Sequence, residues 1–263
     1  MNKQLPVAFA LALCGGSILF GADFEKSKIL LHEDFNKDND KGFAARILRD
    51  SHVTLAKGAG PDGSDAIRVA YVGSKRGSER VVERHPLASK VDQATLSFDV
   101  RFDRDFQWTR GGKLHGLAPK TPITGGKKRR PDGWSARIMF KKDGKCATYL
   151  YDQSKKRKYG RGSTSAGPAF KAGRWHHVVL EVKLNDPGKD NGFARIRIDD
   201  KPVVSSEKMA FRGRDGGETL IQTFLFNTFH GGSSPKWAPV DKEGKPTTVH
   251  AWFDNFRVTE GVR

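Results

Sequence analysis

The sequence predicts an all-β protein, a sandwich of antiparallel strands. Long helical periodicity is absent from its 263 residues, while short runs of alternating apolar and polar residues recur between Gly, Pro, Asp and Asn. Such alternation gives each strand one face toward a core and one toward solvent or a ligand. The clearest predicted strands are residues 94–102, 177–184 and 193–198.

A single domain is expected from residue 23 to residue 263. Hydrophobic residues make up 37% of the chain and aromatic residues 10%, which is enough apolar material for one sizeable core. The segment 185–192, rich in Asp, Asn and Gly, predicts a turn between two of the strands. No linker or internal repeat interrupts the pattern, so we expect one sandwich.

Residues 1–22 predict a signal peptide, and hence a secreted or periplasmic protein. Lys3 precedes an uncharged, apolar stretch that ends in small residues and is too short for a spanning helix. Cys14 lies in this stretch and leaves a lipid anchor as an alternative, although Leu13 is bulkier than such a site usually accepts. Removal of the peptide leaves Cys146 alone, so no internal disulfide can form.

The charge of the chain predicts a polyanionic partner. Lys and Arg total 47 against 30 Asp and Glu, for a net charge of +17 and a pI near 9.9. A broad positive field attracts nucleic acid, anionic membranes and acidic polysaccharides alike. Export disfavours nucleic acid, and no nucleic-acid-binding motif is present, so we expect an acidic polysaccharide, no nucleic acid and no membrane segment beyond the signal peptide.

A hairpin with one polar face is predicted between residues 133 and 151. Residues 142–144 favour a three-residue loop with Gly144 in the left-handed conformation. This loop pairs the two lysines that flank it. Counting outward, the register places Arg137 opposite Tyr149, and Ser135 opposite Tyr151.

These four side chains then share one face, because residues two apart on a strand point the same way. A two-residue loop would place Arg137 beside Leu150, so the separation of polar and apolar residues favours the longer loop. The same register brings the basic runs 127–130 and 155–158 together at the open end of the hairpin. Upstream, Lys113 lies among glycines, where the backbone can approach a ligand closely.

These residues resemble the alginate lyases and related glucuronan-cleaving enzymes of polysaccharide lyase family 14, a β-jelly-roll family. The resemblance rests on Gly-Gly-Lys-Leu-x-Gly-Leu from residue 111, Trp-Ser-Ala-Arg from residue 134 and Tyr-x-Tyr from residue 149. It implies a jelly roll of two antiparallel sheets with a concave substrate cleft. It also implies that the matching positions bind and cleave substrate: Lys113, Ser135, Arg137, Tyr149 and Tyr151. The chain departs from the family at His115, where members commonly have proline, and in its basic loop 125–130.

Cleavage of a 4-linked uronan by β-elimination suits these groups. The substrate carboxylate must be neutralised before the C5 proton can leave, and Arg137 and Lys113 supply positive charge. Tyr149, Tyr151 and Lys113 remain rival candidates for base and acid, and nearby cations should favour an ionised tyrosine. Ser135 is expected to orient substrate or a tyrosine hydroxyl. No step requires a metal or another cofactor.

Two histidines are further candidates for substrate binding. His115 lies two residues after Lys113, and His230 ends the alternating run 222–230, whose face toward cleft or core the pattern leaves open. The function expected is a monomeric, secreted alginate lyase that leaves 4,5-unsaturated uronate ends. Glucuronan lyase is the nearest alternative, and a non-catalytic carbohydrate-binding module on the same sandwich is the second.

Overall fold

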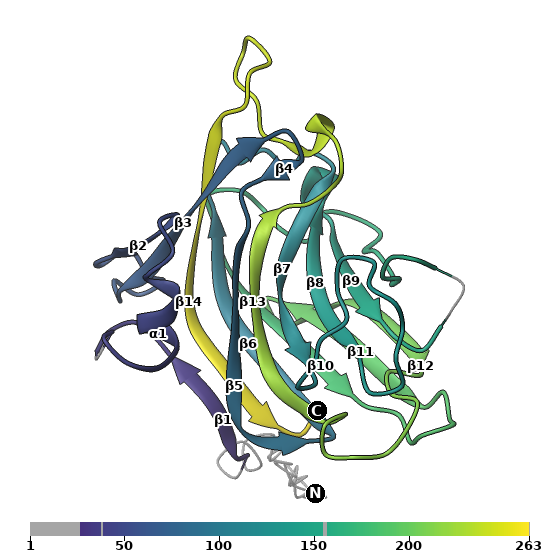
Figure 1. The fold of residues 1–263 in the computed structure, drawn as a ribbon. Coiled ribbons are helices and arrows are strands. Elements are labelled where there is room, and N and C mark those ends of the chain that lie inside the picture. Colours follow the sequence, from purple (N-terminus) through teal and green to yellow (C-terminus); the bar gives the residue numbers. More distant parts are fainter. Residues whose placement is uncertain (1–26, 38, 155–156, 263) are drawn as a thin grey trace, which may run out of the picture.

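The protein is a β-jelly roll of two antiparallel sheets packed face to face (Figure 1), so the predicted fold class is confirmed. The computed structural model describes residues 27–37, 39–154 and 157–262. The predicted signal peptide, residues 1–22, and two lysines of the second basic run, residues 155–156, lie outside the described residues.

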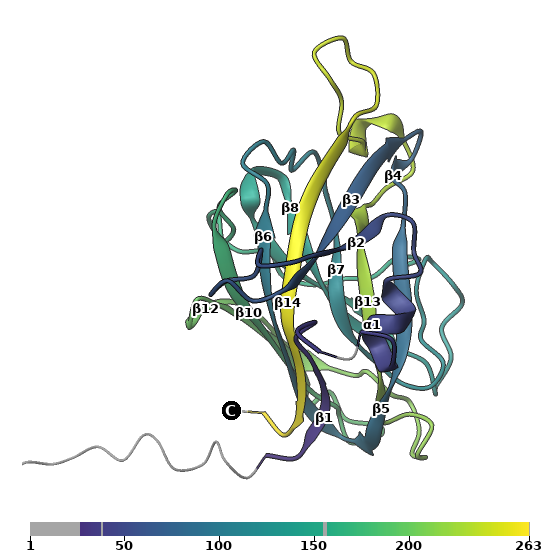
Figure 2. The same ribbon diagram turned by 90° about the vertical axis from the view of Figure 1, so that its left-hand side faces the viewer.

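Among the described residues, the larger sheet has nine strands in the order β12-β11-β10-β6-β14-β3-β2, with β1 paired to β14 and β4 paired to β3. Figure 2 shows the side of the molecule on which β3 and β14 lie. The strands are β1 (Ile29–Glu33), β2 (Val53–Ala56), β3 (Ala66–Ser74), β4 (Gly77–Ser78), β6 (Gln93–Phe102), β10 (Trp175–Lys183), β11 (Gly192–Ile198), β12 (Lys201–Met209) and β14 (Thr248–Glu260).

The second sheet has five strands in the order β5-β13-β7-β8-β9 within the same described ranges. Its strands are β5 (Val81–Val91), β7 (Gly111–Ala118), β8 (Ser135–Lys141), β9 (Cys146–Tyr151) and β13 (Ile221–His230). The three strands expected most clearly from alternation all form, as β6, β10 and β11, with ends that differ by one or two residues.

Phenylalanines from both sheets make up the centre of the core. Phe98 on β6 and Phe256 on β14 stack at 5.7 Å between ring centroids, and both are fully buried. Phe224 and Phe226 reach them from β13 of the other sheet, at 5.5 Å and 5.7 Å from Phe256. Burial of so much aromatic surface is the main force that holds the sheets together.

The helix α1 (Gly42–Ile47) closes one end of this core. It has six residues, of which Phe43, Ala44 and Ile47 are buried, and Phe43 contacts the ring of Phe256 at 5.7 Å. The only other helical segments in the described ranges are the single turns η1 (Lys142–Gly144) and η2 (Pro235–Trp237). None of the helices described is long and apolar enough to span a bilayer.

A β-bulge in β14 sets the direction of the core phenylalanines. The register with β6 shifts between Asp254 and Arg257, and Asn255 has a φ of 53° within this step. The extra residue breaks strict alternation, so Phe253 and Phe256, three apart, both face the core. Asparagine tolerates the left-handed conformation better than most residues do, which suits the bulge.

We expect Phe256→Ala to lower the free energy of unfolding by about 3–5 kcal/mol, because it leaves a large cavity among well-packed rings. Urea unfolding followed by tryptophan fluorescence measures the loss. Ile29→Ala, at a side chain 47% exposed on β1, is the control and should change stability by less than about 1 kcal/mol. Equal losses in the two variants would contradict this account of the core.

Candidate active site

The β8–β9 hairpin brings four of the predicted site residues together in the predicted register. Arg137 pairs with Tyr149, and Ser135 pairs with Tyr151. The loop takes two left-handed residues, Asp143 (φ 60°) and Gly144 (φ 70°), so it tightens one residue earlier than expected. The flanking lysines still pair, since the backbone N–H of residue 141 donates to the carbonyl of residue 145 at 2.7 Å.

Lys113 lies beside this hairpin on the neighbouring strand β7, opposite Met139. Its Nζ atom is 3.3 Å from the sulfur of Met139 and 4.0 Å from the ring centroid of Tyr149. Burial, together with the positive charges of Arg137, Lys141 and Arg80, lowers the pKa of Lys113 to about 7. A substantial fraction of the amine is therefore neutral at neutral pH and able to accept a proton.

The glycines around Lys113 allow β7 to lie close to its neighbours. A Cβ atom at Gly116 would fall 2.0 Å from the carbonyl oxygen of Ala136 and 2.7 Å from the Cα of Arg137. A Cβ atom at Gly112 would fall 2.2 Å from the ring of Phe140. The Gly-Gly-Lys-Leu-x-Gly pattern therefore reflects sterics beneath the site, as well as access to a ligand.

Arg137 forms the buried floor of the site. Its side chain is 3% exposed, and its guanidinium carbon lies 5.2 Å from the ring centroid of Tyr149 and 5.9 Å from that of Tyr151. Burial lowers the pKa of Arg137, although a guanidinium stays charged at neutral pH. Its Nε donor has no acceptor among the described residues. A substrate carboxylate would supply both the missing acceptor and a counter-charge.

The two tyrosines differ from the expectation that nearby cations would favour their ionised form. The hydroxyl oxygens of Tyr149 and Tyr151 lie 3.5 Å apart. Burial raises the pKa of Tyr149 above its usual value, the hydroxyl of Tyr151 raises it further, and the charge of Arg137 offsets only part of this. The prediction of an ionised tyrosine is wrong for Tyr149, because desolvation outweighs the neighbouring charge. A protonated Tyr149 is suited to act as an acid.

The sequence predicts Ser135 as a site residue, but its hydroxyl group is hydrogen-bonded to the backbone of a loop. The side chain is fully buried, and Oγ donates a hydrogen bond to the backbone carbonyl of Ile123 at 2.8 Å. This bond fastens the segment 119–134, which connects β7 to β8. The structure therefore supports a role for Ser135 in positioning the loop that lies beside the site.

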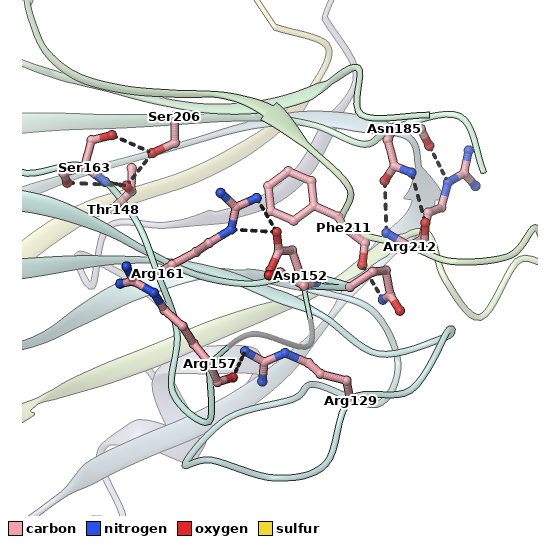
Figure 3. Close-up of polar contacts among 12 residues, drawn as sticks. Arg129, Thr148, Asp152, Arg157, Arg161, Ser163, Asn185, Ser206, Phe211 and Arg212 are labelled. Atoms are coloured by element: carbon pink, nitrogen blue, oxygen red, sulfur yellow. Dashed lines mark hydrogen bonds and ion pairs between the residues drawn. The ribbon is translucent and has the colours of Figure 1, made fainter. Parts of the chain in front are cut away.

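The basic segment of this loop lies against Tyr151. The backbone N–H of Gly126 donates to the Tyr151 hydroxyl at 2.9 Å, and the guanidinium of Arg129 lies 4.3 Å from the centroid of its ring. Arg129 in turn donates to the backbone carbonyl of Arg157 at 3.4 Å, a contact visible in Figure 3. The described parts of the two basic runs thus meet at the open end of the hairpin, as predicted.

An ion pair holds the segment that follows β9 and carries the second basic run. Asp152, directly after β9, is almost fully buried and accepts from Nε and Nη2 of Arg161 at 2.8 Å and 2.5 Å (Figure 3). The chain then runs back beside β9 and places Gly160 against both tyrosine rings. A Cβ atom at Gly160 would lie 2.9 Å from Tyr151 and 3.0 Å from Tyr149. Glycine there lets the rings keep their places.

His115 does not belong to the site, which corrects the expectation from sequence. The registers of β7 with β8 and with β13 both shift between Lys113 and Gly116, so a bulge turns Leu114 and His115 toward the core. The ring of His115 is fully buried, and its centroid is 4.3 Å from that of Phe226 and 4.7 Å from that of Phe98. Alternation alone would have put it on the face of Lys113.

His230 also faces the core, so its expected contact with substrate is not supported. The even-numbered residues of β13 from Phe224 onward point inward, and the His230 ring stacks on Phe106 at 5.2 Å. Its Nε2 atom lies 2.7 Å from the carbonyl oxygen of Gln107, and burial lowers its pKa to about 4. A neutral, hydrogen-bonded histidine of this kind stabilises the fold.

Residues that the sequence reading missed complete the outer face of the sheet. Asn227 is buried on β13, and its side-chain N–H donors have no acceptor among the described residues. Arg80 lies over the ring of Phe229 at 5.3 Å, and the charge of Arg84 acts on Arg137. The alternation of residues 222–230 predicts that Asn227 lies on the face opposite to that of the even-numbered residues, but only the structure tells which of the two faces points outward.

The described residues contain no group of three or more His, Cys, Asp and Glu side chains that could hold a metal ion. From its own side chains, this face can perform acid–base and electrostatic chemistry. Lys113 can accept a proton, Tyr149 can donate one, and Arg137 can neutralise a carboxylate.

Comparison with known proteins identifies the class of enzyme. The family model described as Polysaccharide lyase 14 matches residues 70–256, more than half of the chain. A jelly roll that gathers cations and tyrosines on one outer face agrees with that match, and the chain is a polysaccharide lyase. More specifically, it belongs to polysaccharide lyase family 14. No curated protein matches the chain in sequence.

Solved structures share the fold at low identity. Alginate lyase Aly36B is 23% identical with a TM-score of 0.68, over 89% of this chain and 97% of that one. The PL-14 alginate lyase from Aplysia kurodai is 20% identical with a TM-score of 0.68, over 89% and 100%. The endo-β-1,4-glucuronan lyase from the fungus Trichoderma reesei is 16% identical with a TM-score of 0.57, over 89% and 96%.

The burial of His115 predicts a loss of stability in acid. Burial lowers its pKa well below the value of about 6.5 in the unfolded chain, so only the unfolded state gains a proton as the pH falls through 6.5. From about pH 7.5 to about pH 5, this costs roughly 2 kcal/mol. His115→Leu should lose less stability over that range than the wild type, as measured by urea unfolding at each pH. Equal losses would show that His115 is protonated in the folded protein.

Proposed function

We propose that the protein is an alginate lyase that cleaves 4-linked uronate chains by β-elimination and leaves 4,5-unsaturated uronate ends. The observation that carries this proposal is the meeting of three groups on the outer face of the five-stranded sheet: Lys113 with its pKa lowered to about 7, the buried Arg137, and the protonated Tyr149. Together they supply a base, a carboxylate-binding cation and an acid.

The reaction follows from these three groups. Arg137 pairs with the carboxylate on C5 and withdraws charge from it, which makes the C5 proton more acidic. The neutral amine of Lys113 takes that proton, the C4–C5 double bond forms, and the C4–O4 bond breaks. Tyr149 gives its proton to the departing O4 oxygen. Solvent then takes the proton from Lys113 and returns one to Tyr149.

Two features support alginate as the substrate. Aly36B has been solved with alginate tetrasaccharide in a variant lacking a lysine and a tyrosine, and with alginate trisaccharide in a variant lacking a lysine and a methionine. A lysine, a tyrosine and a methionine also meet here, as Lys113, Tyr149 and Met139. Glucuronan presents its carboxylate at the same ring position and is the alternative substrate, in line with the fold shared with the Trichoderma enzyme.

The proposal extends to where and how the enzyme works. The predicted signal peptide at residues 1–22 supports a secreted or periplasmic enzyme, where polymeric substrate is accessible. The net charge of +17 supports attraction to an acidic polysaccharide. We propose that it acts as a monomer, because all the groups used in the reaction come from one chain.

The first test is digestion of polymannuronate, polyguluronate and glucuronan, followed by the ultraviolet absorbance of the new C4–C5 double bond. We expect product from at least one alginate block. Lys113→Ala and Tyr149→Phe should each reduce kcat at least about 100-fold, because each removes a proton-transfer group. Lys142→Ala, in the hairpin turn, is the control and should keep the wild-type rate.

Two outcomes would overturn the proposal. Absence of unsaturated product from every uronan would reject the lyase assignment, and retention on an alginate column without product would favour a non-catalytic binding module. Full activity of Lys113→Ala or Tyr149→Phe would reject the site even if the wild type is a lyase.

The second test is the pH dependence of kcat/KM. Only neutral Lys113 accepts the C5 proton, so the rate should fall about tenfold per pH unit below its pKa and level off above about pH 7. Lys141→Gln removes a positive charge that lowers this pKa, so it should move the acid limb toward higher pH. An acid limb that stays in place in this variant would argue against Lys113 as the base.

A further inference from the structure

A ladder of alternating arginine and tryptophan side chains crosses the outer face of the nine-stranded sheet. The register pairs Arg68 on β3 with Trp252 on β14, Trp252 with Arg101 on β6, and Arg101 with Trp175 on β10. We refer to these four residues as the Arg–Trp ladder. All four side chains are at least partly exposed. Their neighbours in sequence, among them Phe253 and Phe102, face the core.

Each guanidinium of the ladder lies over an indole ring. Arg101 is 4.6 Å from the ring centroid of Trp252 and 5.1 Å from that of Trp175, and Arg68 is 5.6 Å from Trp252. Stacking of this kind uses the flat face of the guanidinium and leaves the N–H donors at its edge free. It also holds a long side chain in place, which lowers the entropy cost of binding a ligand.

These donors have no hydrogen-bond or ion-pair partner among the described residues. Among residues 27–37, 39–154 and 157–262, neither Arg68 nor Arg101 makes a hydrogen bond or an ion pair to a carboxylate. Asp103 acts on Arg101 only through its charge, and partial burial nevertheless lowers the pKa of Arg101. By contrast, Arg195 on the same sheet stacks on Phe193 at 3.9 Å but is ion-paired with Glu207 at 2.7 Å.

A carboxylate on the same strand as Arg101 is engaged by residues outside the ladder. Asp99, two residues before Arg101 on β6, accepts from Asn255 Nδ2 at 2.7 Å and lies 2.7 Å from Nδ1 of His177. The ladder therefore presents two indoles and two positive charges that have no ion-pair partner in the described part of the chain, on a partly exposed face of the sheet. It lies on the far side of the sandwich from Lys113, so it cannot belong to the candidate active site.

We propose that the Arg–Trp ladder is a second, non-catalytic binding site for acidic polysaccharide. This proposal rests on the proposed function only in the choice of ligand, a polyuronate. Charge complementarity favours this ligand, because stacked guanidiniums form paired hydrogen bonds with carboxylates. The two partly exposed indoles offer apolar contact to sugar rings.

The spacing of the ladder suits such a chain. Arg68 and Arg101 stand two strands apart, which corresponds to roughly 9–10 Å across a sheet. An extended 4-linked chain in which every second uronate presents its carboxylate to the same side repeats over two sugar lengths, a similar distance. Bound there, the polymer would stay attached to the enzyme while another stretch enters the candidate site. The ladder would thus raise the local concentration of cleavable chain.

Affinity electrophoresis through native gels that contain sodium alginate tests the proposal. Every protein carries Lys113→Ala, so the polymer stays intact if the enzyme is a lyase. Arg68→Gln with Arg101→Gln should weaken retention about tenfold at low salt. The control, Arg195→Gln with Arg214→Gln, removes the same charge from arginines already ion-paired to glutamates, and should be retained like its parent. Arg101→Lys keeps the charge but loses the planar donors, so it should weaken retention as well.

Equal retention of the ladder and control variants would overturn the proposal, because it would show that net charge alone binds the polymer. Thermal melting checks that each variant is folded, and full retention of a folded Arg101→Lys variant would also count against the ladder. The measurement needs no cleavage, so it holds even if the lyase assignment fails. In the otherwise wild-type enzyme, the double ladder variant should raise KM for alginate polymer and leave the cleavage of a tetrasaccharide unchanged.

Discussion

Crowding of positive charge on a largely buried sheet surface is the constraint on which the site depends. Arg137 is almost fully buried, and Lys113 lies beside it with a pKa lowered to about 7. Keeping two such cations out of water is costly, so the rest of the structure must hold them in place. The aromatic core beneath the sheet and the loops above it provide that support, and an anionic substrate would relieve the repulsion when it binds.

Much of this arrangement could be predicted from sequence where local geometry, such as that of a short turn, allows few conformations. The hairpin register was correct because a short turn fixes which residues face each other, so Arg137 and Tyr149 were placed together. Strict alternation failed where the chain carries an extra residue. The bulge in β7 turns His115 inward, and the one in β14 sends Phe253 and Phe256 to the same side. A bulge leaves no reliable mark in a single sequence.

Electrostatic expectations failed for a related reason. Neighbouring cations suggested an ionised tyrosine, but the pKa of Tyr149 is governed by how deeply its hydroxyl is buried, which only the packed structure determines. The hydroxyl of Ser135 is expected to orient substrate or a tyrosine hydroxyl, and instead donates its hydrogen bond to the carbonyl of Ile123. A place for Asn227 on the outer face of the sheet could not be predicted, because the alternation of residues 222–230 leaves open which side faces the core. Long-range packing decided all three outcomes.

The link between Gly126 and Tyr151 bears on how this enzyme could diversify. The hydrogen bond uses the main chain of residue 126, so it does not depend on which side chains follow in the loop. Lys127, Lys128 and Arg130 can therefore be exchanged for other residues while the hydrogen bond to the tyrosine is kept. Natural variation or laboratory selection could change the charge at the rim of the candidate site there, with the proposed proton-transfer residues inherited unchanged.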